Sequence, residues 1–393
     1  MMVGRSSFGI LIGAAVGTLF LVPAHGLAQW LPFEVDPCSG AVIYMSQLEG
    51  LIRCAESGYA PDQYTLGVMY ANGMRVAEDD AQAVLWFRMA AEQGHASAQH
   101  KLGLMYGEGE GVPEDDAEAV RWYRLAAEQG YAPAQGTLGA MYDNGSGVLE
   151  DDAEALRWYQ LSAGQGFAAA QYNLGIMYEH GDAVPEDDGE AVRWYRLSAD
   201  QGFASGQYNL GVMYRNGYGV PQDDGEAVRW YQLSAEQGFA AAQYNLGVMY
   251  AHGYGVPEDD GEAVRWYRLA ADQGYANAQF NLGVMYSRGE GITEDDAEAV
   301  RWYRLAADQG NALAQTNLGL MYANGYGVPE DLVFSYMWFN LSAAQGNETA
   351  QSNGEIIERY MTREQISEAQ RLSLEWIETH PQDGATEDAD SSP

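Results

Sequence analysis

The segment Leu66-Gly67-Val68-Met69-Tyr70 is the first of eight similar segments in this sequence. Each has the form Leu-Gly-x-Met-Tyr, and the others begin at residues 102, 138, 174, 210, 246, 282 and 318. Every step is 36 residues, and a tryptophan and a Gln-Gly pair keep the same interval, starting at Trp86 and Gln93. Three markers in one uninterrupted register indicate a tandem array of a 36-residue unit.

One unit, residues 95–130, predicts two helices joined by a turn. The first helix has apolar residues three and four apart: Ala98, Leu102, Met105 and Tyr106. A glycine-rich stretch, residues 107–113, ends that helix. We expect Asp115 to cap the second helix, Glu118 to complete a capping box, and Gly130 to follow its last turn.

Gly103 and its equivalents fall inside the first helix of every unit. Glycine there costs about 1 kcal/mol relative to alanine. The recurrence of this cost predicts that each first helix packs closely against its neighbours.

The repeated pattern resembles the Sel1-like repeat family, a relative of the tetratricopeptide repeat. The resemblance covers residues 59–346 and rests on Ala-x-Ala-Gln-x-x-Leu-Gly-x-Met-Tyr, Gly-x-Gly-Val-Pro, Asp-Asp-x-Glu-Ala-x-x-Trp-Tyr and Ala-Ala-x-Gln-Gly. It implies an all-α fold, a right-handed α/α superhelical solenoid with a concave face. It also implies an adaptor or scaffold that binds proteins.

Residues 1–28 have the features of a secretory signal peptide: Arg5, an apolar stretch over residues 8–22, and small residues before residue 29. We therefore expect export, to the periplasm or, alternatively, out of the cell. An uncleaved membrane anchor is a third interpretation, which the short apolar stretch disfavours. Residues 29–58 form a predicted N-terminal cap, in which Cys38 and Cys54 are expected to form a disulfide.

The C-terminal end departs from the repeat, as the end of a solenoid must. Residues 347–380 are predicted to form capping helices, the last of them from Thr362 to about Ile377. Residues 381–393 are rich in acidic and small residues, and we expect this tail to be disordered.

The chain carries 56 acidic and 20 basic residues, a formal net charge of −36. Such a surface excludes binding to nucleic acid through phosphate neutralisation, and it repels anionic headgroups. It suits a basic protein or peptide partner, or a high-salt environment in which acidity maintains solubility. The sequence leaves the oligomeric state open.

The candidate binding residues lie on the first helices. Five successive units have asparagine before Leu-Gly: Asn173, Asn209, Asn245, Asn281 and Asn317. By the resemblance to tetratricopeptide repeats, this position lines the concave groove and binds the backbone of extended peptides. The same resemblance adds the aromatic neighbours and some residues after Met-Tyr: Tyr172, Tyr208, Tyr244, Phe280, His180, Arg215 and His252. The alternative is that duplication copied idle asparagines.

No catalytic constellation is visible. The sequence has no nucleophile motif, no phosphate-binding loop and no metal-ligand spacing, and helix capping explains the Asp-Asp pairs better than calcium does. We therefore expect a non-enzymatic scaffold without cofactor or metal. The alternatives are a secreted factor that binds a host or neighbouring cell and, less favoured, a cell-wall or β-lactam hydrolase. Three tyrosines between loop glycines are expected to fold back over the packing seam rather than form an exposed stripe: Tyr218, Tyr254 and Tyr326.

Overall fold

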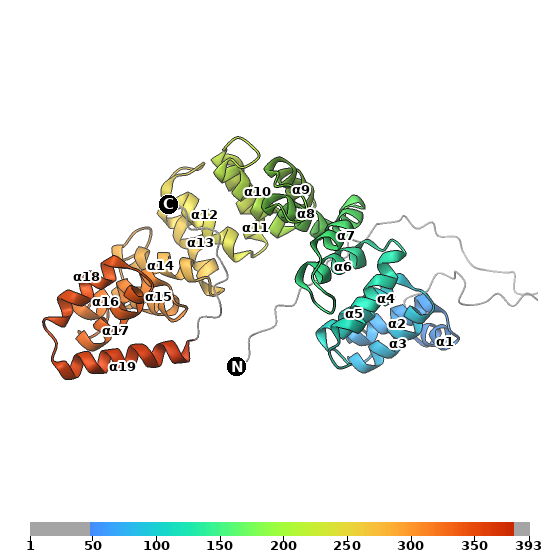
Figure 1. Cartoon of the computed structure of the whole chain (residues 1–393), viewed down its shortest axis with the longest axis horizontal. Helices are drawn as coiled ribbons and strands as arrows, with labels where there is room; N and C mark the ends of the chain where they lie inside the picture. The colour runs from blue at the N-terminus through green and yellow to red at the C-terminus, as the bar shows by residue number, and fades with distance from the viewer. Residues whose placement is uncertain (1–47, 381–393) are drawn as a thin grey trace, which may run out of the picture. The chain divides into compact units, whose positions relative to one another are not determined.

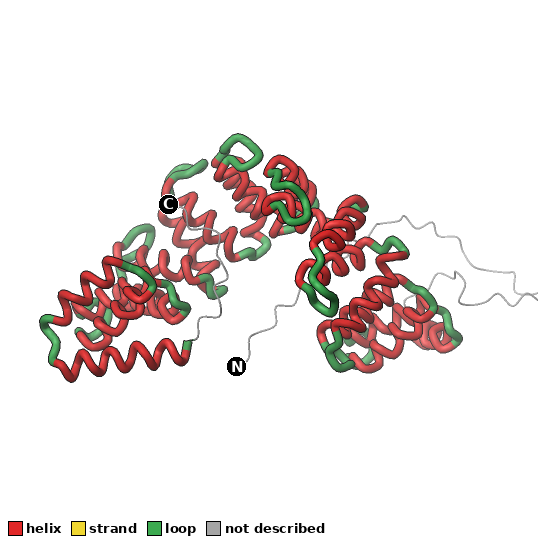
Figure 2. The backbone as a smooth tube through the Cα atoms, in the orientation of Figure 1, coloured by secondary structure: helices red, strands yellow, loops and turns green. Residues whose placement is uncertain are grey.

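The structure is a computed structural model that describes residues 48–380, and all regular secondary structure in this range is helical. Figures 1 and 2 show its 19 helices. Sixteen of them form eight consecutive pairs, numbered here as repeats 1 to 8, and each pair has a first helix and a second helix.

Each first helix begins at an alanine and ends at the residue before a glycine of positive φ, except that α2 ends one residue earlier. They are α2 (Ala60–Ala71), α4 (Ala96–Glu108), α6 (Ala132–Asn144), α8 (Ala168–His180), α10 (Ala204–Asn216), α12 (Ala240–His252), α14 (Ala276–Arg288) and α16 (Ala312–Asn324). The second helices begin just after a capping aspartate. They are α3 (Asp80–Glu92), α5 (Asp116–Glu128), α7 (Asp152–Gly164), α9 (Asp188–Asp200), α11 (Asp224–Glu236), α13 (Asp260–Asp272), α15 (Asp296–Asp308) and α17 (Leu332–Ala344).

Local signals set these boundaries. The Asp115 carboxylate accepts a hydrogen bond of 3.0 Å from the Glu118 amide, which confirms the predicted cap. The predicted capping box at Glu118 is wrong, because the Glu118 carboxylate binds the Arg121 guanidinium at 2.7 and 3.0 Å instead. A charged donor one turn further along competes better than the backbone amide of the cap.

The glycine inside each first helix is where the two helices of a repeat meet. A Cβ atom added to Gly103 would lie 2.6 Å from the ring of Tyr123 on α5. No side chain fits at that distance, so the recurrent glycine admits an aromatic ring, which is tyrosine in repeats 2 to 7 and phenylalanine in repeats 1 and 8. The predicted close packing is confirmed, and its partner is the second helix of the same repeat.

The hydrophobic core lies between repeats. One cluster joins Phe87 of α3 to Leu102 of α4 and Trp122 of α5. It therefore combines the second helix of repeat 1 with both helices of repeat 2. Corresponding clusters follow along the array, so each repeat depends on its neighbours for burial.

A glutamine ladder crosses the same interfaces. The buried Gln99 donates from Nε2 to the Ala91 carbonyl of the preceding repeat, at 3.0 Å. Its Oε1 accepts from Gln129 Nε2 at 2.6 Å. The equivalent glutamines, from Gln63 to Gln315, are at most 4% exposed. The ladder satisfies carbonyl groups at the ends of the second helices.

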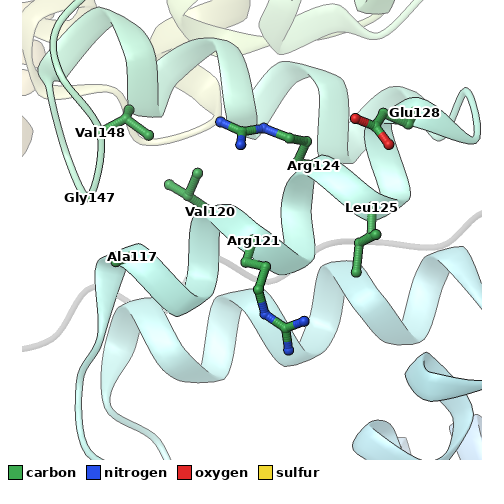
Figure 3. Close-up of a pocket in the computed structure, with 8 residues that line it drawn as sticks. All are labelled: Ala117, Val120, Arg121, Arg124, Leu125, Glu128, Gly147 and Val148. Carbon is green, nitrogen blue, oxygen red and sulfur yellow. The ribbon is translucent and has the colours of Figure 1, made fainter.

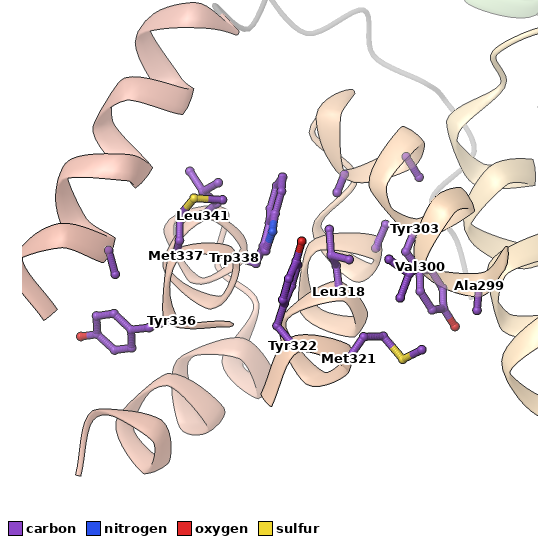
Figure 4. Close-up of a cluster of buried hydrophobic side chains, with 14 residues drawn as sticks. Ala299, Val300, Tyr303, Leu318, Met321, Tyr322, Tyr336, Met337, Trp338 and Leu341 are labelled. Carbon is purple, nitrogen blue, oxygen red and sulfur yellow. The ribbon is translucent and has the colours of Figure 1, made fainter. Parts of the chain in front are cut away.

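Three further helices flank the array: α1 (Leu48–Glu56), α18 (Glu348–Glu358) and α19 (Arg363–Thr379). Thr362 and Gln365 form a reciprocal capping box at the start of α19, close to the predicted helix start. Figure 4 shows the apolar cluster around α17, including Trp338. The Trp338 ring also meets the ring of Trp376 on α19, with centroids 6.2 Å apart.

Cys54 lies on α1 and is 9% exposed. Cys38 lies outside the described residues, so the predicted disulfide stays a prediction. The predicted signal peptide, the cap up to residue 47 and the tail from residue 381 also lie outside this range. Between residues 48 and 380, no helix is long and apolar enough to span a bilayer.

Candidate functional site

The predicted asparagine ladder lies on the first helices, and each asparagine is partly exposed. Asn209 lies beside the Tyr195 hydroxyl on the preceding second helix, near enough for its amide to lower the pKa of that tyrosine. Burial and the Glu179 carboxylate both raise the pKa of Tyr195, and Asn209 opposes them. The same contact recurs along the ladder, in the pairs Asn173–Tyr159, Asn281–Tyr267 and Asn317–Tyr303.

Asn245 makes a related contact, because its Nδ2 lies 3.4 Å from the Tyr208 hydroxyl. The asparagines therefore support buried tyrosines. Each amide also has a carbonyl oxygen and a second N–H with which it can contact a ligand.

The aromatic residues before the asparagines are partly buried packing residues. The Tyr172 ring lies 5.9 Å from that of Tyr195 and 5.6 Å from that of Phe203. Tyr208, Tyr244 and Phe280 make the corresponding ring contacts. These four rings therefore pack against other aromatic rings, and none of them is an isolated exposed contact residue.

Four of the predicted residues come together in a pocket of 520 Å³ formed by α10, α11 and α12. They are Arg215, Tyr244, Asn245 and His252. Arg215 Nη1 lies 2.8 Å from Asp224 Oδ1. The same guanidinium lies 4.3 Å from the centroid of the Tyr254 ring. The His252 ring stacks on Tyr254 with centroids 5.3 Å apart and an interplanar angle of 5°.

A second pocket, of 530 Å³, lies two repeats further along, on α14, α15 and α16. Its lining includes Asn317, Ser287 and Tyr326, which stand 72 residues after Asn245, Arg215 and Tyr254. The two pockets therefore use equivalent positions of the repeat. We call the surface that these positions form along the first helices and the loops after them the first-helix groove. The other predicted residues lie on first helices but do not line these two pockets: Tyr172, Asn173, Tyr208, Asn209, Phe280, Asn281 and His180.

The loop tyrosines follow the expectation only in part. Tyr254 is 37% exposed and folds back over the joint of repeats 5 and 6, where its ring centroid lies 4.3 Å from the Arg215 guanidinium. Tyr218 and Tyr326 are 51% and 55% exposed, so about half of each side chain stays in water. The sequence signal for this outcome was their place between two glycines of positive φ, such as Gly253 and Gly255.

The second-helix face carries a different kind of surface. A pocket of 310 Å³ lies there. Figure 3 shows the residues that line it, from α5 and the loop after α6. Arg121 on this face pairs with Glu118 at 2.7 Å and lies 4.4 Å from the Trp122 ring centroid. The same arrangement recurs in repeats 3 to 7, as in Arg193 with Glu190 and Trp194. On this face, each of these arginines is therefore paired with a glutamate of its own repeat.

In the part of the chain that the structure describes, no three acidic, histidine or cysteine side chains are placed to hold a metal ion. The fold and the groove define a helical-repeat solenoid. Its eight units match the Sel1 repeat over residues 60–95, 96–131, 132–167, 168–203, 204–239, 240–275, 276–311 and 312–347, and the chain belongs to the Sel1 repeat family. Sel1 repeat proteins generally act as scaffolds for protein interactions.

Two solved structures illustrate the similarity. A Sel1 repeat protein from Oxalobacter formigenes is 32% identical, with a TM-score of 0.59 over 86% of this chain and 98% of that chain. A protective antigen present in uropathogenic Escherichia coli strains is 35% identical, with a TM-score of 0.45 over 84% of this chain and 87% of that chain. No curated protein matches this sequence.

Proposed function

We propose that this protein is an exported, non-enzymatic adaptor that binds a segment of another protein along its first-helix groove. The observation that carries the proposal is the contrast between the two helix faces. On the second helices, each Arg121-type guanidinium is paired with a glutamate and lies over a tryptophan. On the first-helix side, partly exposed asparagine amides and the loop tyrosines Tyr254 and Tyr326 line two equivalent hollows, and Arg215, paired with Asp224, lines the first of them.

The chemistry of the groove suits an extended peptide. Asparagine amides can both donate to and accept from a peptide backbone. Exposed aromatic rings and arginine are enriched at protein interfaces. The hollow of 520 Å³ has the size of a side-chain or small-ligand pocket.

Catalysis has less support. The groove has Arg215 tied to Asp224 and His252 stacked on Tyr254, and neither pair presents a nucleophile beside a base. A secreted factor that binds a host or neighbouring cell would use the same groove. It differs from a periplasmic adaptor in where its partner is found.

Site-specific photo-crosslinking tests which face binds. A photoreactive residue at Asn216, which lines the pocket, is expected to crosslink to a partner in the cell envelope or medium. The matched control is Leu197, a 41% exposed residue of the second-helix face. Crosslinks from position 197 but not from position 216 would reject the proposed face. The compartment in which the adduct appears separates the periplasmic adaptor from the secreted factor.

Export has its own measurement. Mass spectrometry of the protein from the periplasm and the medium is expected to show an N-terminus close to residue 29. A cytoplasmic product that retains residues 1–28 would contradict export and leave the binding face untested by this result.

A further inference from the structure

The groove changes in character along the array although the unit around it is repeated. Five positions define it, and in repeat 5 they hold Arg215, Asn216, Tyr218, Gln222 and Asp224. Three of these line the pocket, Asp224 binds Arg215, and Tyr254, the repeat-6 equivalent of Tyr218, also lines it. The same five positions in other repeats lie a multiple of 36 residues earlier or later.

In repeats 2 to 4 these positions are acidic. Repeat 4 has Glu179, Asp182, Glu186 and Asp188, with His180 at the remaining position. Repeat 2 has four carboxylates and repeat 3 has three, so eleven of the fifteen positions are acidic and none is Lys or Arg.

The side chains of these repeats occupy equivalent places. Tyr159 donates to Asp143 at 3.1 Å, and Tyr195 donates to Glu179 in the same way one repeat later. Burial raises the pKa of Asp143, the bond from Tyr159 lowers it, and the nearby carboxylates of Asp152 and Asp182 raise it again. Carboxylates in this part of the groove therefore lie close enough to repel one another.

Repeats 5 and 6 interrupt this acidity. Their ten positions hold three carboxylates and one guanidinium, and Arg215 neutralises Asp224 directly. Glutamine replaces glutamate at position 222, and tyrosine stands at positions 218 and 254 where repeat 4 has Asp182. These two tyrosines are 51% and 37% exposed. The formal charge of these positions is thus −2 in repeats 5 and 6 and −11 in repeats 2 to 4, so an aromatic, weakly charged surface lies beside a strongly acidic one.

We propose that the groove takes an extended protein segment made of two blocks. A block rich in Lys and Arg lies along repeats 2 to 4, and an adjoining uncharged block with aromatic side chains lies along repeats 5 and 6. The inference deepens the proposed function and rests on it. It is carried by charge complementarity on the acidic half and by ring and guanidinium contacts on the other half.

A general helix spacing gives the order of length of the segment. At about 10 Å from one repeat to the next, as for packed helices, each repeat corresponds to about three residues of extended chain. Five repeats therefore correspond to about 15 residues of ligand.

Selection of random 15-residue peptides displayed on phage, with the full chain as bait, tests the inference. Enriched peptides are expected to separate Lys and Arg in one half from aromatic and uncharged residues in the other. Enrichment of peptides without this division overturns the inference and leaves the proposed function standing. If no peptide is enriched above a bait-free selection, both fail.

A selected peptide then serves as the probe for two variant sets. The triple variant Glu179→Gln, Asp182→Asn and Glu186→Gln keeps the acceptor for Tyr195 and removes three charges. It is expected to bind about tenfold more weakly at low salt and to lose much of the salt dependence of the dissociation constant.

The double variant Tyr218→Ala and Tyr254→Ala is the matched partner of that set. It is expected to weaken binding by a similar factor while the salt dependence stays that of the unmodified protein. Equal salt dependence in the two sets would overturn the division into blocks. Circular dichroism of each variant confirms that the helices are intact.

Discussion

The second helices of repeats 7 and 8 occupy equivalent places but present different outer surfaces. On α15, Arg301 pairs with Glu298 at 3.1 Å, and the two side chains are 60% and 38% exposed. Leu305 beside them is 40% exposed. This pattern is common to repeats 2 to 7, and it leaves the outer surface of the second helices in water.

On α17 the equivalent residues are apolar. Met337 replaces the arginine and is 5% exposed, and Leu341 replaces Leu305 and is 3% exposed. The difference comes from α19, which packs on α17 and places Trp376 against Trp338. The outer surface of the second helices is therefore apolar where another helix, α19, packs on it. In repeats 2 to 7 the same surface is charged, which favours the first-helix face as the binding face.

The largest expected effect is a matched pair of leucine substitutions. Leu341→Ala should lower the free energy of unfolding by about 2 to 4 kcal/mol, because it leaves a cavity beneath α19. Leu305→Ala should cost less than about 1 kcal/mol, because the side chain is already partly in water. Urea unfolding followed by circular dichroism measures both. Equal losses would show that α15 has a cover of its own.

A second comparison concerns one position of the first helices. Repeat 2 has His100 where repeats 4, 5 and 6 have tyrosine. The ring packs against Tyr123 and Tyr131 and lies 3.2 Å from the Thr137 hydroxyl. Burial lowers the pKa of His100 to about 4, and the neighbouring Lys101 charge adds to this effect.

This pKa predicts acid sensitivity. The unfolded chain binds a proton near pH 6.5 and the folded chain only near pH 4, so His100 contributes its full stability above pH 6.5 and loses it as the pH falls through this window. Between pH 7 and pH 4.5 the loss should be about 2 kcal/mol. His100→Tyr should remove this part of the pH dependence. A parallel pH series of unfolding for both proteins measures the difference, and identical slopes would contradict the assignment.

The sequence predicted the repeat, the helix pairs and the aspartate caps, because each depends on residues close together in one unit. It did not predict the glutamine ladder. Gln99 looked like an ordinary polar residue near a helix start, and only packing of consecutive repeats shows that it meets the Ala91 carbonyl. Its recurrence every 36 residues beside buried alanines was the available signal.

The site was harder to predict than the fold. The sequence predicts the asparagines as ligand-binding residues. It does not predict that they lie beside a tyrosine such as Tyr195, because that contact depends on the angle between neighbouring repeats. The capping box failed for a related reason, since Arg121 lies on the same helix face as Glu118 and offers a stronger donor. The sequence pattern identifies which residues share a helix face, but it does not identify which of the possible partners each side chain binds.

The smallest expected effect concerns a tie between repeats 6 and 7. Arg268 of α13 donates to the Tyr286 hydroxyl of α14 at 2.6 Å. In repeat 5, Gln232 stands in the place of this arginine and donates to Glu236 at 3.0 Å instead. The joint of repeats 6 and 7 therefore has an arginine–tyrosine tie that the joint of repeats 5 and 6 lacks.

Exchanging these side chains tests what the tie contributes. Arg268→Gln should lower the free energy of opening at the joint of repeats 6 and 7 by about 0.5 to 1 kcal/mol, since one partly exposed hydrogen bond is lost. Gln232→Arg should stabilise the joint of repeats 5 and 6 by a similar amount, through Tyr250 at the same 18-residue spacing. Hydrogen exchange of the amides of α12 and α14 reports each joint separately, because a solenoid opens locally. If Arg268→Gln speeds exchange while Gln232→Arg leaves it unchanged, the tie needs more than the arginine, and the two joints differ in helix placement as well.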